Sequence, residues 1–341
     1  MLQPSFLREK RDAVIAALRK RQLSEEELAL VDQIVAADDQ RKAAQTSLDE
    51  ALAKRNKLSE EVGKLFKSGQ REQAESIRQE VSELKTIIAE LEAQLHAAKA
   101  DLQEKLYQLP NVPHELVPAG GGEQDNEVYR AWEGELPQLG AYAKPHWELA
   151  QEYKIFDLEL GVKITGAGFP LFRAYGARLQ RALINFFLDE ARLAGYEEMV
   201  PPHLVNEASA FGTGQLPDKE GQMYHVTEDD LYLIPTAEVP LTNVFRDVIL
   251  EEDQLPLKVT AYTPCFRREA GSYGAHVRGL NRVHQFDKVE IVQIAHPDKS
   301  YDALEEMLAH VSSLLDKLDL PYRILRLCGG DLGFTSALTY D

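Results

Sequence analysis

Residues 77–102 read IRQEVSELKTIIAELEAQLHAAKADL and carry the apolar seam that decides the fold of the N-terminal third. The apolar residues follow one another at alternating spacings of four and three: Ile77, Val81, Leu84, Ile88, Leu91, Leu95, Ala98 and Leu102. This heptad pattern is sustained over about four repeats, and no Pro or Gly interrupts it. It predicts a long coiled-coil helix.

A weaker seam precedes it over residues 31–65, and only a short break at Lys67-Ser68-Gly69 separates the two. Two long helices joined by so short a loop must run antiparallel. At about 1.5 Å per residue, helices of ~35 residues project roughly 50 Å. We therefore expect a helical arm over residues 1–108, with a long antiparallel coiled coil at about 28–106 and a shorter helix over residues 4–20 at its base.

Charge is unevenly distributed along the chain. Lys and Arg number 38 and Asp and Glu number 56, so the formal net charge is −18. A surface of that charge repels nucleic acid and anionic membranes as a whole. Around the bend, however, residues 54–71 carry six basic side chains against Glu60 and Glu61. The six are Lys54, Arg55, Lys57, Lys64, Lys67 and Arg71. This tip is a candidate contact for a phosphate backbone, although such charge runs are more often solvated helix faces.

The composition changes from Leu109 onwards. Three prolines and the run Gly120-Gly121-Gly122 cannot continue a helix and mark a linker. Helical patterns then mix with strand-like runs, and the clearest examples are helices over residues 176–194 and 301–318 and strands over residues 199–201, 260–267 and 283–294. Strands that follow one another without intervening helices favour an antiparallel sheet, so the fold class is α+β.

Several classes of protein and site are excluded by what the sequence lacks. No apolar run approaches the ~18 residues of a membrane helix, and no hydrophobic N-terminal segment suggests a signal peptide. The two cysteines, Cys265 and Cys328, exclude a disulfide scaffold and a four-thiolate zinc site. No ligand set completes His276 and His284. We expect a cytoplasmic, reduced protein that binds no membrane and holds no zinc or other metal through cysteines or histidines.

The residues that carry chemistry gather in a second hairpin, between residues 263 and 290. Period-two alternation places Arg267 and Glu269 on one face of the first strand, and Phe286 and Glu290 on one face of the second. If these faces coincide, the surface offers a cation, two carboxylates and an aromatic ring, which suit a phosphate, an amine and a purine. An ordinary surface strand pair with cross-strand ion pairs is the alternative.

The segment Phe266-Arg267-Arg268-Glu269-Ala270-Gly271, with the returning His-Gln-Phe-Asp-Lys-Val-Glu of residues 284–290, resembles motif 2 of class II aminoacyl-tRNA synthetases, and of the seryl-tRNA synthetase family in particular. Residues 235–243 resemble the Thr-Ala-Glu serine loop of that family. Residues 176–202 resemble motif 1, the dimer-interface helix and strand, and residues 145–149 and 213–217 also match. The resemblance covers essentially the whole chain and makes residues 109–341 a class II catalytic domain built on a mostly antiparallel sheet flanked by helices.

The resemblance also implies the activity. A serine–tRNA ligase uses ATP with Mg²⁺ to convert L-serine into seryl-adenylate, and transfers the seryl group to the 3′ end of tRNA(Ser), with tRNA(Sec) as a further expected substrate. The helical arm of the family binds the long variable arm of the tRNA, and the enzyme is a homodimer through the motif 1 segment 176–202. No strong general base is needed, because the serine carboxylate is already an anionic nucleophile at neutral pH.

Site residues follow from the same resemblance. The implied serine-binding residues are Thr236, Ala237, Glu238, Glu290 and Arg267. The implied ATP-binding residues are Arg267, Arg268, Glu269, Val283 and Phe286. The implied tRNA contacts are the six basic residues of the tip, together with Arg278, which faces phosphates or the acceptor end of the tRNA.

One departure from the family concerns the end of the chain. In the family, the position of Asp341 precedes an ATP-binding Glu-x-Ser-Ser segment and motif 3, so we expect a catalytic domain without its C-terminal part and a chain of weak or no activity. A non-catalytic synthetase-like binding protein or fragment, using the arm or the dimer interface, is the alternative. A coiled-coil scaffold would leave the hairpin unexplained. Retention of Arg267, Glu269, Phe286 and Glu290 together favours the enzyme.

Overall fold

The fold is that of a computed structural model, which describes residues 2–218, 221–270 and 278–341. The chain forms two compact units, one of Met1–Ala131 with Arg323–Asp341, the other of Trp132–Tyr322. Gly271 of the motif 2 wording, His276 and the rest of residues 271–277 lie outside the described residues.

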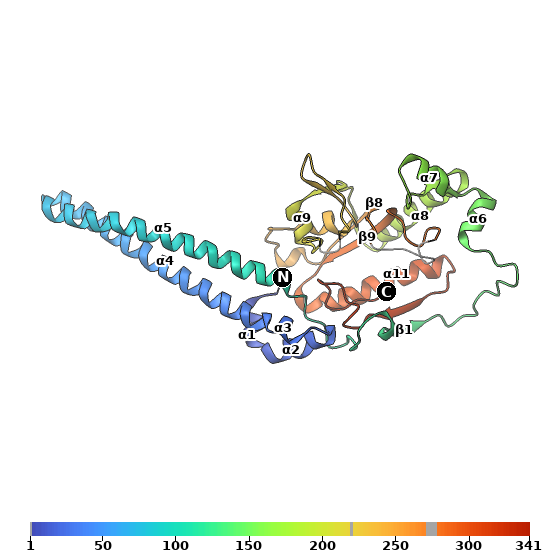
Figure 1. The fold of residues 1–341 in the computed structure, drawn as a ribbon, viewed down its shortest axis with the longest axis horizontal. Helices are drawn as coiled ribbons and strands as arrows, with labels where there is room; N and C mark the ends of the chain where they lie inside the picture. The colour runs from blue at the N-terminus through green and yellow to red at the C-terminus, as the bar shows by residue number, and fades with distance from the viewer. Residues whose placement is uncertain (1, 219–220, 271–277) are drawn as a thin grey trace. The chain divides into compact units, whose positions relative to one another are not determined.

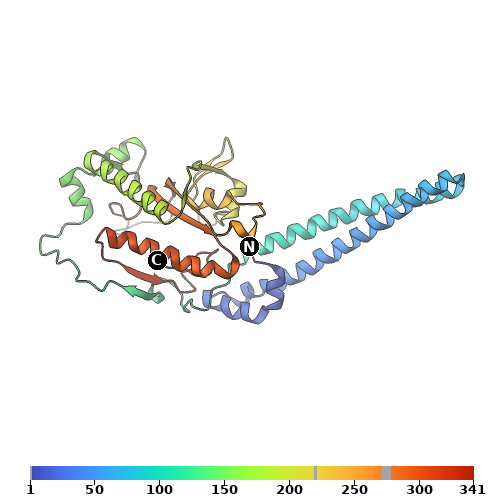
Figure 2. The same cartoon turned by 180° about the vertical axis from the view of Figure 1, so that it is seen from behind.

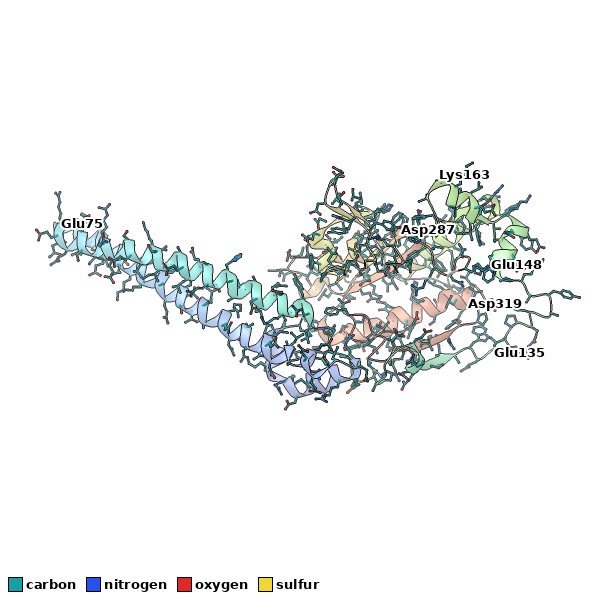
Figure 3. All side chains as sticks on the ribbon, viewed as in Figure 1. Glu75, Glu135, Glu148, Lys163, Asp287 and Asp319 are labelled. Carbon is teal, nitrogen blue, oxygen red and sulfur yellow. The ribbon has the colours of Figure 1, made fainter. Side chains whose placement is uncertain are left out.

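The first unit contains the predicted arm. Helices α4 (Leu30–Lys67) and α5 (Arg71–Gln108) run side by side and antiparallel, as Figures 1 and 2 show from opposite sides. The bend falls at the predicted residues, where Gly69 has a φ of 81° that costs glycine nothing. Glu75, labelled in Figure 3, marks the far end of this helical hairpin. The prediction of a long antiparallel coiled coil is confirmed.

The seam between the helices is also the predicted one. Leu84, Ile88 and Leu95 of α5 are 5–7% exposed, and Leu48 of α4 packs against the last two. A polar member of the α4 seam, Asp38, is only 3% exposed. Its carboxylate lies 2.8 Å from the guanidinium of Arg41 and 2.6 Å from the ammonium of Lys42, so the buried charge is compensated.

The base of the arm is more broken than expected. In place of one helix over residues 4–20, the chain forms three short ones: α1 (Pro4–Glu9), α2 (Arg11–Leu18) and η1 (Arg19–Arg21). Helix α3 (Glu25–Leu28) follows them. Lys10 leaves the helical region, with φ −115° and ψ 24°. Leu7 of α1 and Val14 of α2 both lie in the core formed with Ile34 and Leu106.

Arg21 fastens distant segments of this unit together. Its guanidinium donates to the carbonyl oxygens of Asn111 (2.9 Å), Leu332 (3.1 Å), Gly333 (3.2 Å) and Ser336 (2.5 Å). Burial lowers the pKa of Arg21 to about 10. Strand β1 (Glu127–Ala131), which follows the turn η2 (Glu123–Asp125), pairs antiparallel with β10 (Arg323–Arg326) and closes the unit.

The second unit is a mixed α and β structure. Its helices are α6 (His146–Tyr153), α7 (Leu158–Ile164), α8 (Ala174–Leu193), α9 (Glu207–Gly212), α10 (Glu238–Asn243), η3 (Glu252–Gln254), η5 (Pro297–Lys299) and α11 (Ser300–Lys317). Its strands are β2 (Phe156–Asp157), β3 (Leu171–Phe172), β4 (Glu197–Glu198), β5 (Leu204–Asn206), β6 (His225–Val226), β7 (Leu231–Leu233), β8 (Leu257–Phe266) and β9 (Gln285–Ile294).

Three small sheets organise these strands. They are β2–β3, β5–β7–β6 and β4–β8–β9, and in the described residues every pairing is antiparallel except that of β4 with β8. Helices α8, α10 and α11 contact β9, and Figure 1 shows α11 alongside it. The α+β fold class is confirmed.

The strand predicted at residues 199–201 is wrong. The strand is β4 and ends at Glu198, after which the Met199 amide makes one more bond to the Thr260 carbonyl, at 2.8 Å. Pro201 and Pro202 have no amide hydrogen to extend the ladder. No helix in the described part of the chain is long and apolar enough to cross a membrane.

Candidate active site

Strands β8 and β9 form a regular antiparallel pair that carries most of the predicted site. The register runs from Leu257 opposite Ile294 to Phe266 opposite Gln285. Residues directly opposite each other share a face of such a pair. Cys265 is opposite Phe286 and Ala261 is opposite Glu290, so Phe286 and Glu290 lie on the face of β8 that also continues to Arg267.

Arg267 and Phe286 meet on this face. The guanidinium carbon lies over the Phe286 ring, 5.1 Å from its centroid. The Arg267 amide donates to the His284 carbonyl at 2.9 Å, which extends the ladder by one bond beyond β8. A cation beside an aromatic face is an arrangement that can bind a phosphate and a stacked purine together.

Glu269 is placed by a turn rather than by strand alternation. Strand β8 ends at Phe266, the Arg268 amide donates to the Gln222 carbonyl at 2.8 Å, and Glu269 has a φ of 49°. Its carboxylate forms an ion pair with Arg282 at 2.8 Å. The period-two argument therefore does not place Glu269 beside Phe286. Arg282 did not emerge from the sequence, and an opposite charge across the same loop is the signal that could have found it.

Glu290 is held from two sides by one of its oxygens. Thr236 Oγ1 donates to Glu290 Oε2 at 2.7 Å, and Lys288 Nζ lies 2.7 Å from the same atom. Within residues 2–218, 221–270 and 278–341, no hydrogen bond or ion pair occupies the other oxygen, Oε1. Oε1 is thus oriented by its neighbour and available to a ligand.

Glu238 gives the same place a second carboxylate. Burial raises the pKa of Glu238, the negative charge of Glu290 raises it further, and the ammonium of Lys288 opposes both. The preceding Ala237 is fully buried against Leu241 and Val259, which anchors the loop in the core. The resulting cluster of two carboxylates, one ammonium and one hydroxyl suits a small ligand with an ammonium group.

Lys288 was missed by the sequence argument. The alternation that selected Phe286 and Glu290 also places residue 288 between them on the same face, and that signal could have found it. Val283, predicted to line an adenine site, is buried at 8% exposure just before β9.

The opposite face of β9 is structural. Asp287, labelled in Figure 3, accepts a hydrogen bond from the Tyr262 hydroxyl at 2.6 Å and another from the side-chain amide of Gln180 on α8. Burial, together with the bond to Asp287, raises the pKa of Tyr262. These contacts fix the strand pair on α8 and leave the Arg267 face for ligands.

The predicted tRNA contacts on the arm differ in how far they are already engaged. Lys54 pairs with Glu80 at 2.7 Å and Lys64 with Glu60 at 2.8 Å. Arg55 donates to the side chain of Asn56. Lys57, Lys67 and Arg71 are exposed and form no ion pair with any residue that the structure describes. Arg278, the remaining candidate, lies over the ring of Trp147 on α6.

Comparison with known proteins agrees with both parts of this architecture. Residues 1–113 match the family model of the seryl-tRNA synthetase N-terminal domain, and residues 223–341 match that of the tRNA synthetase class II core domain (G, H, P, S and T). The serine–tRNA ligase of Salinibacter ruber is 51% identical over 312 residues, which cover 92% of this chain and 73% of that protein. The chain belongs to the serine–tRNA ligase family. The serine–tRNA ligase of Chlorobaculum parvum is 44% identical to this chain, over 100% of this chain and 80% of that protein.

A solved structure extends the likeness from sequence to fold. The seryl-tRNA synthetase of Pyrococcus horikoshii, in a crystal structure complexed with ATP, superposes with a TM-score of 0.88 at 32% identity. The match covers 100% of this chain and 80% of that one. The family is that of aminoacyl-tRNA synthetases specific for serine, so the seryl-tRNA synthetase resemblance seen in the sequence is confirmed.

Proposed function

We propose that this chain binds ATP and L-serine, forms seryl-adenylate and transfers the seryl group to tRNA(Ser), and to tRNA(Sec) as well. The observation that carries the proposal is the shared face of Arg267, Phe286 and Glu290, in a chain of the serine–tRNA ligase family. We place this reaction in the cytoplasm, where tRNA is used.

Each side of the face has a role in adenylate formation. Phe286 stacks on the adenine, and Arg267 binds the α-phosphate and the serine carboxylate. A carboxylate oxygen of serine attacks the α-phosphorus, a new P–O bond forms, and pyrophosphate leaves. Arg267 stabilises the charge that develops on the phosphoryl oxygens, which is the main requirement of phosphoryl-type transfer. Arg268, Glu269 and Val283 complete the nucleotide side of the proposal.

Serine is recognised at the Glu290 end of the face. Thr236, with Lys288, holds Glu290 Oε2, so that Oε1 accepts from the ammonium or hydroxyl of serine. Glu238 adds a second negative charge, and Ala237 keeps the loop in place. A site built around a hydroxyl discriminates strongly against alanine, whose binding leaves polar groups unpaired. A ribose hydroxyl of the terminal adenosine of the tRNA then attacks the seryl carbonyl, and AMP leaves.

Mg²⁺ fits this site as an ion carried by the nucleotide. In the described residues no group of three or more His, Cys, Asp or Glu could hold a metal. Mg²⁺ is commonly bound through substrate phosphates with one or two carboxylates, so a dedicated protein cage is not required. When bound, it would neutralise phosphate charge beside Arg267.

Serine-dependent ATP–pyrophosphate exchange tests the first step. The enzyme to use is a full-length one, in which this chain continues through the region that its relatives have beyond the matched part, since the match covers 73–80% of those relatives. Exchange with serine, and not with alanine, threonine or glycine, is expected. No exchange with any amino acid would overturn the proposal and favour the non-catalytic binding protein.

We further propose that the 341 residues alone are a weak catalyst. The support is again the 73–80% coverage of the relatives, together with the expected position of motif 3 beyond the matched part. Exchange by the 341-residue chain is compared with exchange by the full-length enzyme. Equal rates would show that the chemistry is complete without the additional residues.

We propose that residues 1–108 form the helical arm and residues 109–341 the catalytic domain. The helical arm binds the long variable arm of the tRNA by shape and charge. A sharp test removes residues 55–79 and joins Lys54 to Glu80 through a short glycine turn, because their side chains already lie 2.7 Å apart. The cluster of Leu48 and Ile88 stays intact. Exchange should be unchanged, whereas tRNA charging should fall about tenfold or more.

Charge at the tip is tested by replacing Lys57, Lys67 and Arg71 with alanine. Because these cations form no ion pair with the described residues, their loss should weaken tRNA binding and flatten its salt dependence. Lys85→Ala with Lys99→Ala, elsewhere on α5, is the matched control. An unchanged salt slope would assign the arm another role.

We also propose a homodimer through residues 176–202. Helix α8 and the segment after it expose large apolar side chains: Tyr175 (77%), Leu179 (56%), Leu193 (72%) and Val200 (88%). Exposed apolar groups gathered in one stretch of the chain mark an interaction surface. Leu179→Glu should convert a dimer to a monomer in analytical ultracentrifugation, and an unaffected dimer would locate the interface elsewhere.

A further inference from the structure

The first residues of α6 contact the segment that leads into β9. The Leu280 amide donates to His146 Nε2 at 2.8 Å. A backbone amide can only donate, so Nε2 is the acceptor in this bond. Gly279 has a φ of 74°, and a Cβ there would lie 2.1 Å from His146 Nε2. The imidazole therefore fits closely against a backbone that only glycine can supply.

Trp147, the next residue of α6, supports Arg278. The guanidinium carbon of Arg278 lies 4.7 Å from the centroid of the Trp147 ring. His146 in turn meets Trp147 edge to face, with ring centroids 5.0 Å apart. Arg278 is exposed and forms no ion pair with the described residues. A guanidinium on an aromatic face keeps the donors at its edge available for another partner.

The other end of the segment is fastened to the ATP-binding face. The His284 amide donates to the Gly168 carbonyl at 2.7 Å, and the His284 ring stacks on Phe169 with centroids 5.4 Å apart. The His284 carbonyl accepts from the Arg267 amide, and its Nδ1 is bonded to the Tyr224 hydroxyl at 2.8 Å. Residues 278–284 are therefore attached to α6 at one end. At the other end they are attached to Arg267, whose guanidinium lies over the Phe286 ring.

We propose that His146 and Trp147 are positioning residues that hold Arg278 as a phosphate-binding cation for the reaction. This inference rests on the proposed function. His146 sets the backbone at Leu280, Trp147 sets the guanidinium, and neither residue touches substrate. The ligand is a phosphate, which Arg binds through two parallel N–H donors. It belongs either to the triphosphate of ATP or to the phosphodiester backbone at the 3′ end of the tRNA.

The test compares Trp147→Ala, Trp147→Tyr and Glu148→Ala in the full-length enzyme. Glu148, labelled in Figure 3, is the exposed neighbour on the same helix and serves as the control. Trp147→Ala should lower kcat/KM for the phosphate-bearing substrate by roughly 3- to 30-fold, the range of a cation–π contact, and leave the KM for serine unchanged. Trp147→Tyr keeps an aromatic face and should restore most of the rate.

Two assays distinguish the sources of the phosphate. A raised KM for ATP in pyrophosphate exchange assigns Arg278 to the triphosphate. Normal exchange with a raised KM for tRNA in aminoacylation assigns it to the tRNA. Normal values in both assays, or an equal rise in the KM for serine, would overturn the proposal. A wild-type enzyme that fails to exchange with serine would instead overturn the proposed function.

A double-mutant cycle tests whether Trp147 acts through Arg278. If it does, Arg278→Ala with Trp147→Ala should be no slower than Arg278→Ala alone. Losses that add would mean an independent, structural role for Trp147. His146→Ala should repeat the effect of Trp147→Ala, and His146→Gln, which offers an acceptor near the position of Nε2, should restore it; equal loss in both would exclude the hydrogen bond to Leu280 as the cause.

Discussion

The molecule contains two hairpins that are stabilised by different kinds of contact, the helical hairpin α4–α5 and the strand pair β8–β9. In the first, contacts repeat every three or four residues, so that Ile88, Leu91 and Leu95 all pack against the partner helix. In the second, the atoms that matter come from separate segments: Thr236 reaches Glu290 across 54 positions. The repeating apolar seam determines the shape of the helical hairpin. The candidate active site depends on individual contacts that sequence periodicity does not predict. Replacements in the two hairpins should therefore differ sharply in their effect on catalysis.

The largest expected effect is that of Arg267→Ala. Removing a cation that acts on transition-state charge should lower serine-dependent exchange by on the order of 10²-fold or more in the full-length enzyme. Lys163→Ala, an exposed charge on α7 seen in Figure 3, is the control. Near-normal exchange by Arg267→Ala would remove Arg267 from the mechanism.

Thr236→Val should have an intermediate effect. Valine keeps the shape of threonine but cannot donate to Glu290 Oε2, and a hydrogen bond to a charged group contributes about 1.5–3 kcal/mol. The KM for serine should rise by roughly 10- to 100-fold with little change in the KM for ATP. Thr227→Val, at an exposed position, should be silent. A shift in the KM for ATP alone would contradict the placement of serine at this end of the face.

Glu238→Gln should weaken serine binding and stabilise the fold. The folded pKa of Glu238 is raised above 4.5, so the folded chain binds this proton more tightly than the unfolded chain. Stability from this group is therefore lost as pH rises through the window above 4.5. Glutamine cannot ionise, so the melting temperature should rise at pH 7, by about 2–4 °C for each kcal/mol, and the gain should vanish near pH 4. Glu228→Gln, at an exposed position, is the control, and a gain that persists at pH 4 would exclude ionisation as its cause.

Ile88→Ala should have the smallest effect on chemistry. It removes a buried seam residue and should destabilise the arm by roughly 2 kcal/mol, visible as faster amide hydrogen exchange in α4 and α5. Ile87→Ala, its neighbour at 46% exposure, offers a matched control on the same helix. Serine-dependent exchange should be the same in both variants. A drop specific to Ile88→Ala would show that the two hairpins are coupled.

The same contrast explains which parts of the fold and of the candidate site could be predicted from the sequence. The arm, its bend at Gly69 and the shared face of Phe286 and Glu290 come from periodicity, which is a local property. No Pro or Gly stands at the break at Lys10, so no local pattern predicts it. Glu269 turns away from the strand because its backbone adopts a left-handed conformation, and the position of Arg278 depends on a tryptophan 131 positions earlier. Such features arise from tertiary contacts.

The four carbonyl groups that accept hydrogen bonds from Arg21 determine when the base of the arm can complete its contacts during synthesis. The unit that contains the arm stops at Ala131 and resumes at Arg323, so residues 132–322, which number 191, are synthesised in between. At about 5–20 residues per second, roughly 10–40 s separate the emergence of β1 from that of its partner strand. During that interval the guanidinium of Arg21 lacks three of its four acceptors, those of Leu332, Gly333 and Ser336. The base of the arm therefore cannot complete these contacts until residues 332–336 have been synthesised.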